Sequence, residues 1–187
     1  MHLAELGLIA GGLLVTFLLA QPAAAEDAKA VADLEQAAVN GLLAGEYGAA
    51  DEKIRAAIAI ADNDSFNRLA LLQGLIAQRM GGDGRSLMGA AIAAHESNAW
   101  PRPVIAYLLG ARKLQDVADE IRRSGNMFEV KRQQICELSF YAGTFAAADD
   151  ERKFAQRLID KAVQACDPGT PLATLAQAED TALKTQP

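Results

Sequence analysis

From residue 26 onward, apolar residues recur every three or four positions, and no stretch shows sustained alternation of apolar and polar residues. The first spacing is typical of helices with one buried face, whereas alternation is typical of strands. Glycine, proline and Asp/Asn clusters interrupt the pattern and mark turns. We therefore predict an all-α fold, with helices at residues 26–44, 49–61, 66–80, 86–96, 104–109, 114–123, 129–146, 149–166 and 171–183.

The composition of the 187-residue chain supports helices and limits the class of partner. Alanine, the best helix former, accounts for 39 residues, and aromatic residues make up only 5%. Apolar residues make up 51% and charged residues 22%, which is a composition that folds. The formal net charge of −6 argues against nucleic acid or an anionic membrane surface as a partner.

The N-terminus has the pattern of a targeting segment. The uncharged 15-residue run Leu6–Ala20 is shorter than the ~20 residues that a membrane span needs. Small residues at Ala23–Ala25 suit a signal peptidase, so we predict a signal peptide at residues 1–25 and export to a bacterial periplasm. The residues before the run include no lysine or arginine, and the alternative is an uncleaved anchor in the inner membrane, with the protein facing the periplasm.

Two distant sets of three small residues have the same internal spacing, 12 positions and then 7. The sets are Ala38, Ala50 and Ala57, and Gly143, Ala155 and Ala162. They are offset by 105 residues, which is three times 35. Small residues let antiparallel helices approach closely, and a period near 35 residues is typical of stacked helix pairs.

These sets, together with the segment from Gly45 through Tyr47 to Ile58, resemble the tetratricopeptide repeat family, which has a 34-residue period. The resemblance implies that Tyr47 and the six small residues pack the repeats of a right-handed α-solenoid. It also implies one domain at residues 26–187. Its parts are a first helix pair at about 28–62, a second at about 65–97, an irregular middle at 99–126, a last pair at about 129–167 and a capping helix at 171–184.

The C-terminal half has a narrower resemblance. The segment Trp100–Pro103 leads to Tyr107–Gly110, and Phe140–Gly143 follows later. This order resembles exported bacterial tetratricopeptide proteins of the NlpI type. The resemblance implies a scaffold or adaptor for envelope proteins such as proteases and peptidoglycan hydrolases.

The two cysteines, Cys136 and Cys166, have their midpoint at residue 151, close to a turn predicted at residues 148–150. In an antiparallel helix pair these two helix ends meet, so we predict a structural disulfide that spans 30 positions. Two buried thiols are the alternative. A catalytic thiol is not expected, because the sequence lacks CxxC spacing and a histidine partner.

Patterns of catalysis and ligand binding are missing after residue 25. His95 is the one histidine there, and we find no P-loop, nucleophile elbow or calcium loop. We therefore expect no enzymatic activity, no cofactor and no metal site. The single tryptophan, Trp100, is expected either to fill the junction between the two halves or to contact a partner. Of the adjacent Phe140 and Tyr141, one is expected in the core and the other in a groove, which makes Tyr141 a candidate partner contact.

These features favour a non-enzymatic protein–protein interaction module of the cell envelope. It would hold a peptide or a helix in the groove formed by the first helix of each pair. Two alternatives remain. One is a membrane-tethered subunit of an envelope complex, and the other is a cell-wall hydrolase with two carboxylates in a deep cleft.

Overall fold

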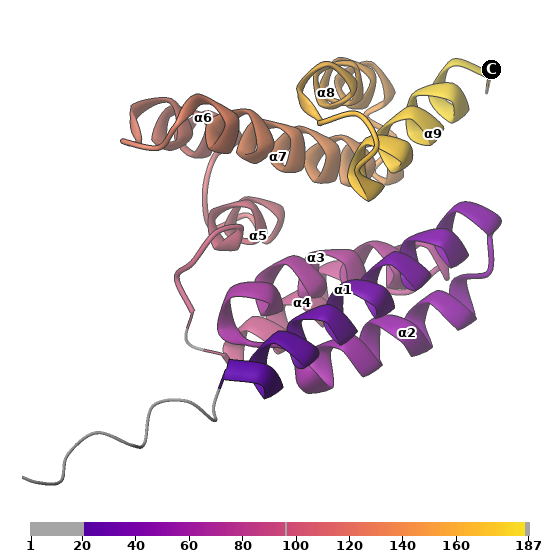
Figure 1. The fold of residues 1–187 in the computed structure, drawn as a ribbon. Coiled ribbons are helices and arrows are strands. Elements are labelled where there is room, and N and C mark those ends of the chain that lie inside the picture. The colour runs from indigo at the N-terminus through magenta and orange to yellow at the C-terminus, as the bar shows by residue number, and fades with distance from the viewer. Residues whose placement is uncertain (1–20, 96, 186–187) are drawn as a thin grey trace, which may run out of the picture.

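The computed structural model describes residues 21–95 and 97–185, and every regular element within them is a helix (Figure 1). The predicted all-α class is confirmed. The helices are α1 (Gln21–Ala44), α2 (Tyr47–Ile60), α3 (Asn63–Arg79), α4 (Gly84–Ala93), α5 (Arg102–Leu108), α6 (Leu114–Arg123), α7 (Phe128–Ala148), α8 (Arg152–Ala165) and α9 (Pro171–Thr185). Residues 1–20 of the expected signal peptide lie outside the described residues, and the expected cleavage position after Ala25 falls inside α1.

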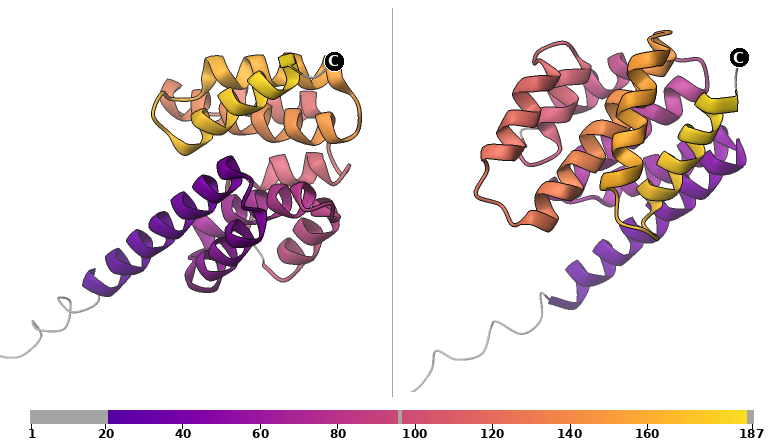
Figure 2. Two further views of the ribbon diagram at one scale, coloured as in Figure 1. Left: turned by 90° about the vertical axis from the view of Figure 1, so that its right-hand side faces the viewer. Right: turned by 90° about the horizontal axis from the view of Figure 1, so that it is seen from above.

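The helices pack mainly against their neighbours in sequence. The most extensive contacts join α7 with α8, α1 with α2 and α3 with α4, and α2 also packs against α3 and α8 against α9. In Figures 1 and 2, α1–α4 form one group and α6–α9 form a second group, with the short α5 between them. This packing of helix pairs is consistent with a solenoid.

Short polar segments begin two of the helices in the first group. The Asp62 carboxylate accepts a hydrogen bond from the Ser65 backbone N–H (2.8 Å), and Asp83 accepts one from the Ser86 N–H (2.9 Å). Each aspartate thereby satisfies one of the backbone donors left unpaired at a helix N-terminus. The turns before α3 and α4 are therefore fixed by local sequence.

One hydrophobic core joins the two helix groups. Buried apolar side chains from each of the nine helices in the described part of the chain belong to a single cluster. The largest fully buried residues include Phe140 and Phe145 of α7 together with Leu72 and Leu75 of α3. Helices α3 and α7 are therefore the central elements of the fold.

The six small residues expected to pack the repeats are buried. Five alanines have no exposed surface, namely Ala38, Ala50, Ala57, Ala155 and Ala162. A Cβ atom at Gly143 would lie 2.7 Å from Cδ1 of Ile159, so α7 and α8 approach closely at that point. Tyr47 begins α2 and is half-buried.

Helices α3 and α4 cross at a pair of glycines that the sequence pattern did not single out. A Cβ atom at Gly84 would overlap the carbonyl oxygen of Gly74 in α3. A backbone oxygen cannot yield as the end of a flexible side chain can, so only glycine fits at this crossing.

The substitution Gly84→Ala is expected to lower the free energy of unfolding by about 1–3 kcal/mol, because the added methyl group forces the two helices apart. Urea unfolding followed by circular dichroism measures this change. The matched control is Gly48→Ala in α2, where an added Cβ has no neighbour within 4 Å. That variant is expected to gain about 0.5–1 kcal/mol from helix propensity. Equal effects of the two substitutions would contradict the close crossing.

Candidate functional site

A cavity of about 270 Å³ lies between the two helix groups. Its walls come from α1 and α3 on one side and from α7 and the start of α9 on the other. Helices α1, α3 and α7 are the first members of their pairs, which is the position that forms the concave surface of a helical solenoid. The walls combine aliphatic side chains with a small number of charged ones.

A two-point ion pair joins α1 and α3 at one wall. Nε of Arg68 donates to both carboxylate oxygens of Glu35, at 3.0 and 3.2 Å, and Nη2 donates to Oε2 at 3.0 Å. Such bidentate contacts are stronger and more directional than a single contact. Glu35 therefore neutralises Arg68, and both side chains are held against the cavity.

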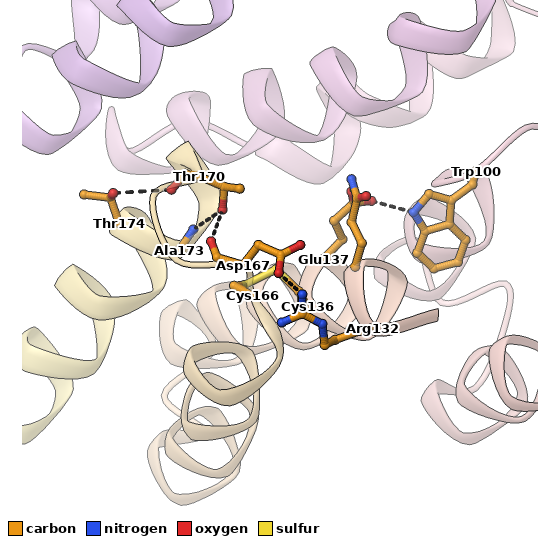
Figure 3. Close-up of a disulfide and its surroundings, with 10 residues drawn as sticks. Trp100, Arg132, Cys136, Glu137, Cys166, Asp167, Thr170, Ala173 and Thr174 are labelled. Carbon is orange, nitrogen blue, oxygen red and sulfur yellow. Dashed lines mark hydrogen bonds and ion pairs between the residues drawn. A yellow bond between two sulfur atoms is a disulfide. The ribbon is translucent and has the colours of Figure 1, made fainter. Parts of the chain in front are cut away.

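The opposite wall holds a buried carboxylate. Glu137 in α7 is only 5% exposed. Its Oε2 accepts a hydrogen bond from the indole N–H of Trp100 (Figure 3). Its Oε1 accepts one from the Gln133 amide at 3.2 Å. Burial raises the pKa of Glu137, while these two hydrogen bonds and the positive charge of Arg68 oppose the rise.

The segment that connects the two groups is tied to α3 as well as to α7. The buried Asn67 side chain donates to the Ala99 carbonyl oxygen at 2.9 Å and to the Ser97 hydroxyl at 3.5 Å. Trp100 is half-buried and packs against the core, and its N–H reaches Glu137. Trp100 therefore lies at the junction of the two groups, which is one of the two positions expected for it.

Cys136 in α7 and Cys166 at the end of α8 lie within disulfide-bonding distance, with Cα atoms 4.8 Å apart (Figure 3). Cys136 lines the cavity beside Glu137. The residue after Cys166 is Asp167, which forms an ion pair with Arg132 of α7. The disulfide and the ion pair together fix the turn before α9 against α7.

Tyr141 and Phe140 are both buried, with 3% and 0% of their surfaces exposed. Tyr141 lines the cavity and Phe140 does not, although both belong to the hydrophobic core, so a partner contact at Tyr141 stays a prediction. The Tyr141 side chain belongs to the cavity wall, and only an occupant of the cavity would reach it. Its hydroxyl makes no hydrogen bond with any residue in the described part of the chain.

Sequence reasoning missed the charged residues of this site. Glu35 and Arg68, and the neutral Gln133 beside Glu137, lie on ordinary amphipathic helix faces, where polar and charged residues are commonly solvated. Glu137 carried a signal, because it is the one charged residue in the mostly apolar stretch 135–143. His95, the one histidine after residue 25, follows the C-cap of α4 and stacks on Phe66, with the ring centroids 3.8 Å apart.

Within residues 21–95 and 97–185, no group of three or more His, Cys, Asp or Glu side chains is arranged to hold a metal ion. No helix in that part of the chain combines the length and apolar character needed to cross a membrane.

No protein-family model, no curated protein and no solved structure matches this chain. The resemblance to tetratricopeptide repeats therefore stays a prediction. The cavity and its charged side chains define the candidate site on their own.

Replacing both cysteines with Cys136→Ser and Cys166→Ser is expected to lower the free energy of unfolding by about 3.6 kcal/mol, from the loop-closure entropy of 30 residues. Urea unfolding of the variant and of the oxidised protein measures the difference. Dithiothreitol should destabilise only the protein that has both cysteines. A count of two free thiols in the unfolded, unreduced protein would contradict the disulfide.

The stability effect of Glu137 is expected to depend on pH. Because its folded pKa lies above the ordinary value of 4.5, the folded state holds the proton more tightly than the unfolded chain. The contribution of this carboxyl to stability therefore falls as the pH rises from 4.5 through its folded pKa. In the Glu137→Gln variant, the side chain keeps its shape and stays neutral at every pH. The free energy of unfolding of the variant, minus that of the original protein, should therefore rise over this window and then level off.

Urea unfolding at a series of pH values between about 4 and 8 measures this difference. Glu129→Gln is the matched control, because Glu129 lies on the exposed first turn of the same helix. The effect of burial would be contradicted if the difference in free energy of unfolding between Glu137→Gln and the original protein did not change with pH. It would also be contradicted if Glu129→Gln gave the same change.

Proposed function

We propose that this protein is a non-enzymatic interaction module of the bacterial cell envelope, exported to the periplasm, that binds a segment of another protein in the cleft between its two helix groups. The cavity between α1, α3, α7 and α9 carries the proposal. It combines an aliphatic wall with a few fixed polar groups, which is the usual composition of a binding site. A scaffold or adaptor role follows if a second partner binds elsewhere on the helices.

The rigidity of the cleft supports binding over chemistry. The three carboxylates at the cavity are each held by partners in the same molecule. Glu35 is held by Arg68, Glu137 by Gln133 and Trp100, and Asp167 by Arg132. A site whose side chains are already fixed loses little conformational entropy when a partner binds.

The cell-wall hydrolase is the second candidate, because two carboxylates, Glu35 and Glu137, line one cavity and burial raises the pKa of Glu137. A general acid of this type must carry a proton on one oxygen. Both oxygens of Glu137 instead accept hydrogen bonds, and both oxygens of Glu35 are engaged by Arg68. This arrangement favours the binding role.

Export is supported by two observations. The cysteine pair at disulfide-bonding distance fits an oxidising compartment. The apolar run before Ala25 fits a signal peptide. If the segment stays uncleaved, the same interaction module is held at the inner membrane and faces the periplasm.

Site-specific photo-crosslinking tests the interaction role. A photoreactive amino acid is placed at Gln133, an exposed residue at the mouth of the cavity, in cells that make the full chain. Irradiation is expected to give one or two discrete protein adducts. The matched control is the same amino acid at Glu52, which is well exposed on α2 away from the cavity.

Absence of adducts at Gln133, or the same adducts at both positions, would contradict a partner in the cleft. Hydrolysis of purified cell wall by the protein, lost on Glu137→Gln, would instead establish the second candidate.

A further inference from the structure

We propose that the cavity between α1, α3, α7 and α9 takes a lysine side chain of the protein partner, with the ammonium group held by the two glutamates and the hydroxyl of Tyr141. This inference rests on the proposed function and names the chemistry that the cleft recognises. It draws on the charge of the cavity, an unpartnered polar group and the aliphatic wall.

The charged groups of the cavity leave it negative. Glu35 and Glu137 are acidic, and Arg68 is the single basic residue among the lining side chains of α1, α3 and α7. Asp167 also lines the cavity, but its charge is matched by the ion pair with Arg132. The remaining charge of about −1 lies in a partly desolvated space, where it attracts a cation more strongly than it would in water.

Arg68 does not block a cation, because its guanidinium is already engaged. Both Nε and Nη2 donate to the Glu35 carboxylate, so the positive charge is neutralised at short range. The Glu137 carboxylate has two donors, Trp100 and Gln133. A carboxylate offers about four lone-pair sites, so Glu137 keeps capacity for an ammonium N–H.

Tyr141 gives an independent indication of a polar occupant. Its side chain is 3% exposed and lines the cavity, and its hydroxyl makes no hydrogen bond with the described residues. Burial, followed by the charges of Glu137 and Glu35, raises the pKa of Tyr141, so the phenol stays neutral. The phenol oxygen keeps lone pairs that can accept a hydrogen bond from an ammonium N–H in the cavity.

The apolar part of the cavity suits the stem of lysine. Val39 and Leu72 lie on one side, and Leu172 and Leu175 of α9 lie on the other. A lysine buries its four-carbon stem along such a surface while its charged end reaches polar groups. The acceptors lie on opposing helices, with Glu35 on α1 and Glu137 and Tyr141 on α7. This distribution suits a compact ammonium with three donors better than the planar fork of arginine.

The NMR resonance of the Trp100 indole N–H reports binding in the cavity. Trp100 is the only tryptophan, and its indole N–H donates to Glu137, so its single indole resonance in a ¹⁵N-labelled full chain reports on the cavity. The probe is Nα-acetyl-lysine N-methylamide, and its matched control is the norleucine derivative, which has the same stem without the ammonium group. The lysine derivative is expected to shift the Trp100 resonance saturably and to bind about tenfold or more tighter than the norleucine derivative.

Two substitutions remove groups that are proposed to contact the ammonium, and a third serves as the control. Glu137→Gln is expected to weaken the lysine derivative by about tenfold or more. Tyr141→Phe removes only the hydroxyl and should weaken it by a smaller factor. Glu52→Gln, on the exposed face of α2, should leave the affinity unchanged.

Three results would overturn the inference. They are no saturable shift at any soluble concentration of the lysine derivative, equal affinity of the norleucine derivative, and tighter binding of the arginine derivative. Crosslinking from Gln133 in the Glu137→Gln variant distinguishes the inference from the proposed function. Undiminished adducts there would overturn the lysine site and leave the interaction role standing, whereas an absence of adducts in the original protein would overturn the interaction role itself.

Discussion

The arrangement of this molecule depends on the burial of one carboxylate, that of Glu137, between its two helix groups. A buried carboxylate is unfavourable unless hydrogen bonds and nearby positive charge compensate for the lost water. At Glu137 this compensation comes from three places, namely the connecting segment through Trp100, the same helix through Gln133, and the other helix group through Arg68. The burial of this one carboxylate thereby constrains the position of the connecting segment, the register of α7 and the approach of α3.

Two adjacent residues of helix α3 contact different parts of the molecule. Asn67 holds the connecting segment by its contact with Ala99, and Arg68 holds α1 through Glu35. Neighbouring residues on a helix point about 100° apart, so a single turn of α3 faces both the linker and the cavity. The position of the linker and the shape of the cavity are therefore set by the same few residues, and a change in one displaces the other.

The sequence predicted what depends on local spacing. Helix positions follow from a period of three to four residues, and the alanines with no exposed surface, such as Ala38 and Ala155, lie where the spacing indicated. The cysteine pair was predicted because the midpoint between Cys136 and Cys166 lies close to a turn. The cavity was not predicted, because its contacts join residues far apart in the chain, 33 positions for Glu35 and Arg68 and 37 for Trp100 and Glu137. No local pattern specifies which solvated-looking charge on one helix will meet which group on another.

The arrangement of the cavity walls has a consequence for the order of folding. Most helix contacts join neighbours in sequence, and a chain with such low contact order folds quickly from local pieces. The cavity is the exception, because its walls come from α1 and α3 and from α7 and α9, which are far apart in the chain. The cleft thus exists only when all four helices are in place, and a ligand that needs both walls binds only the folded chain.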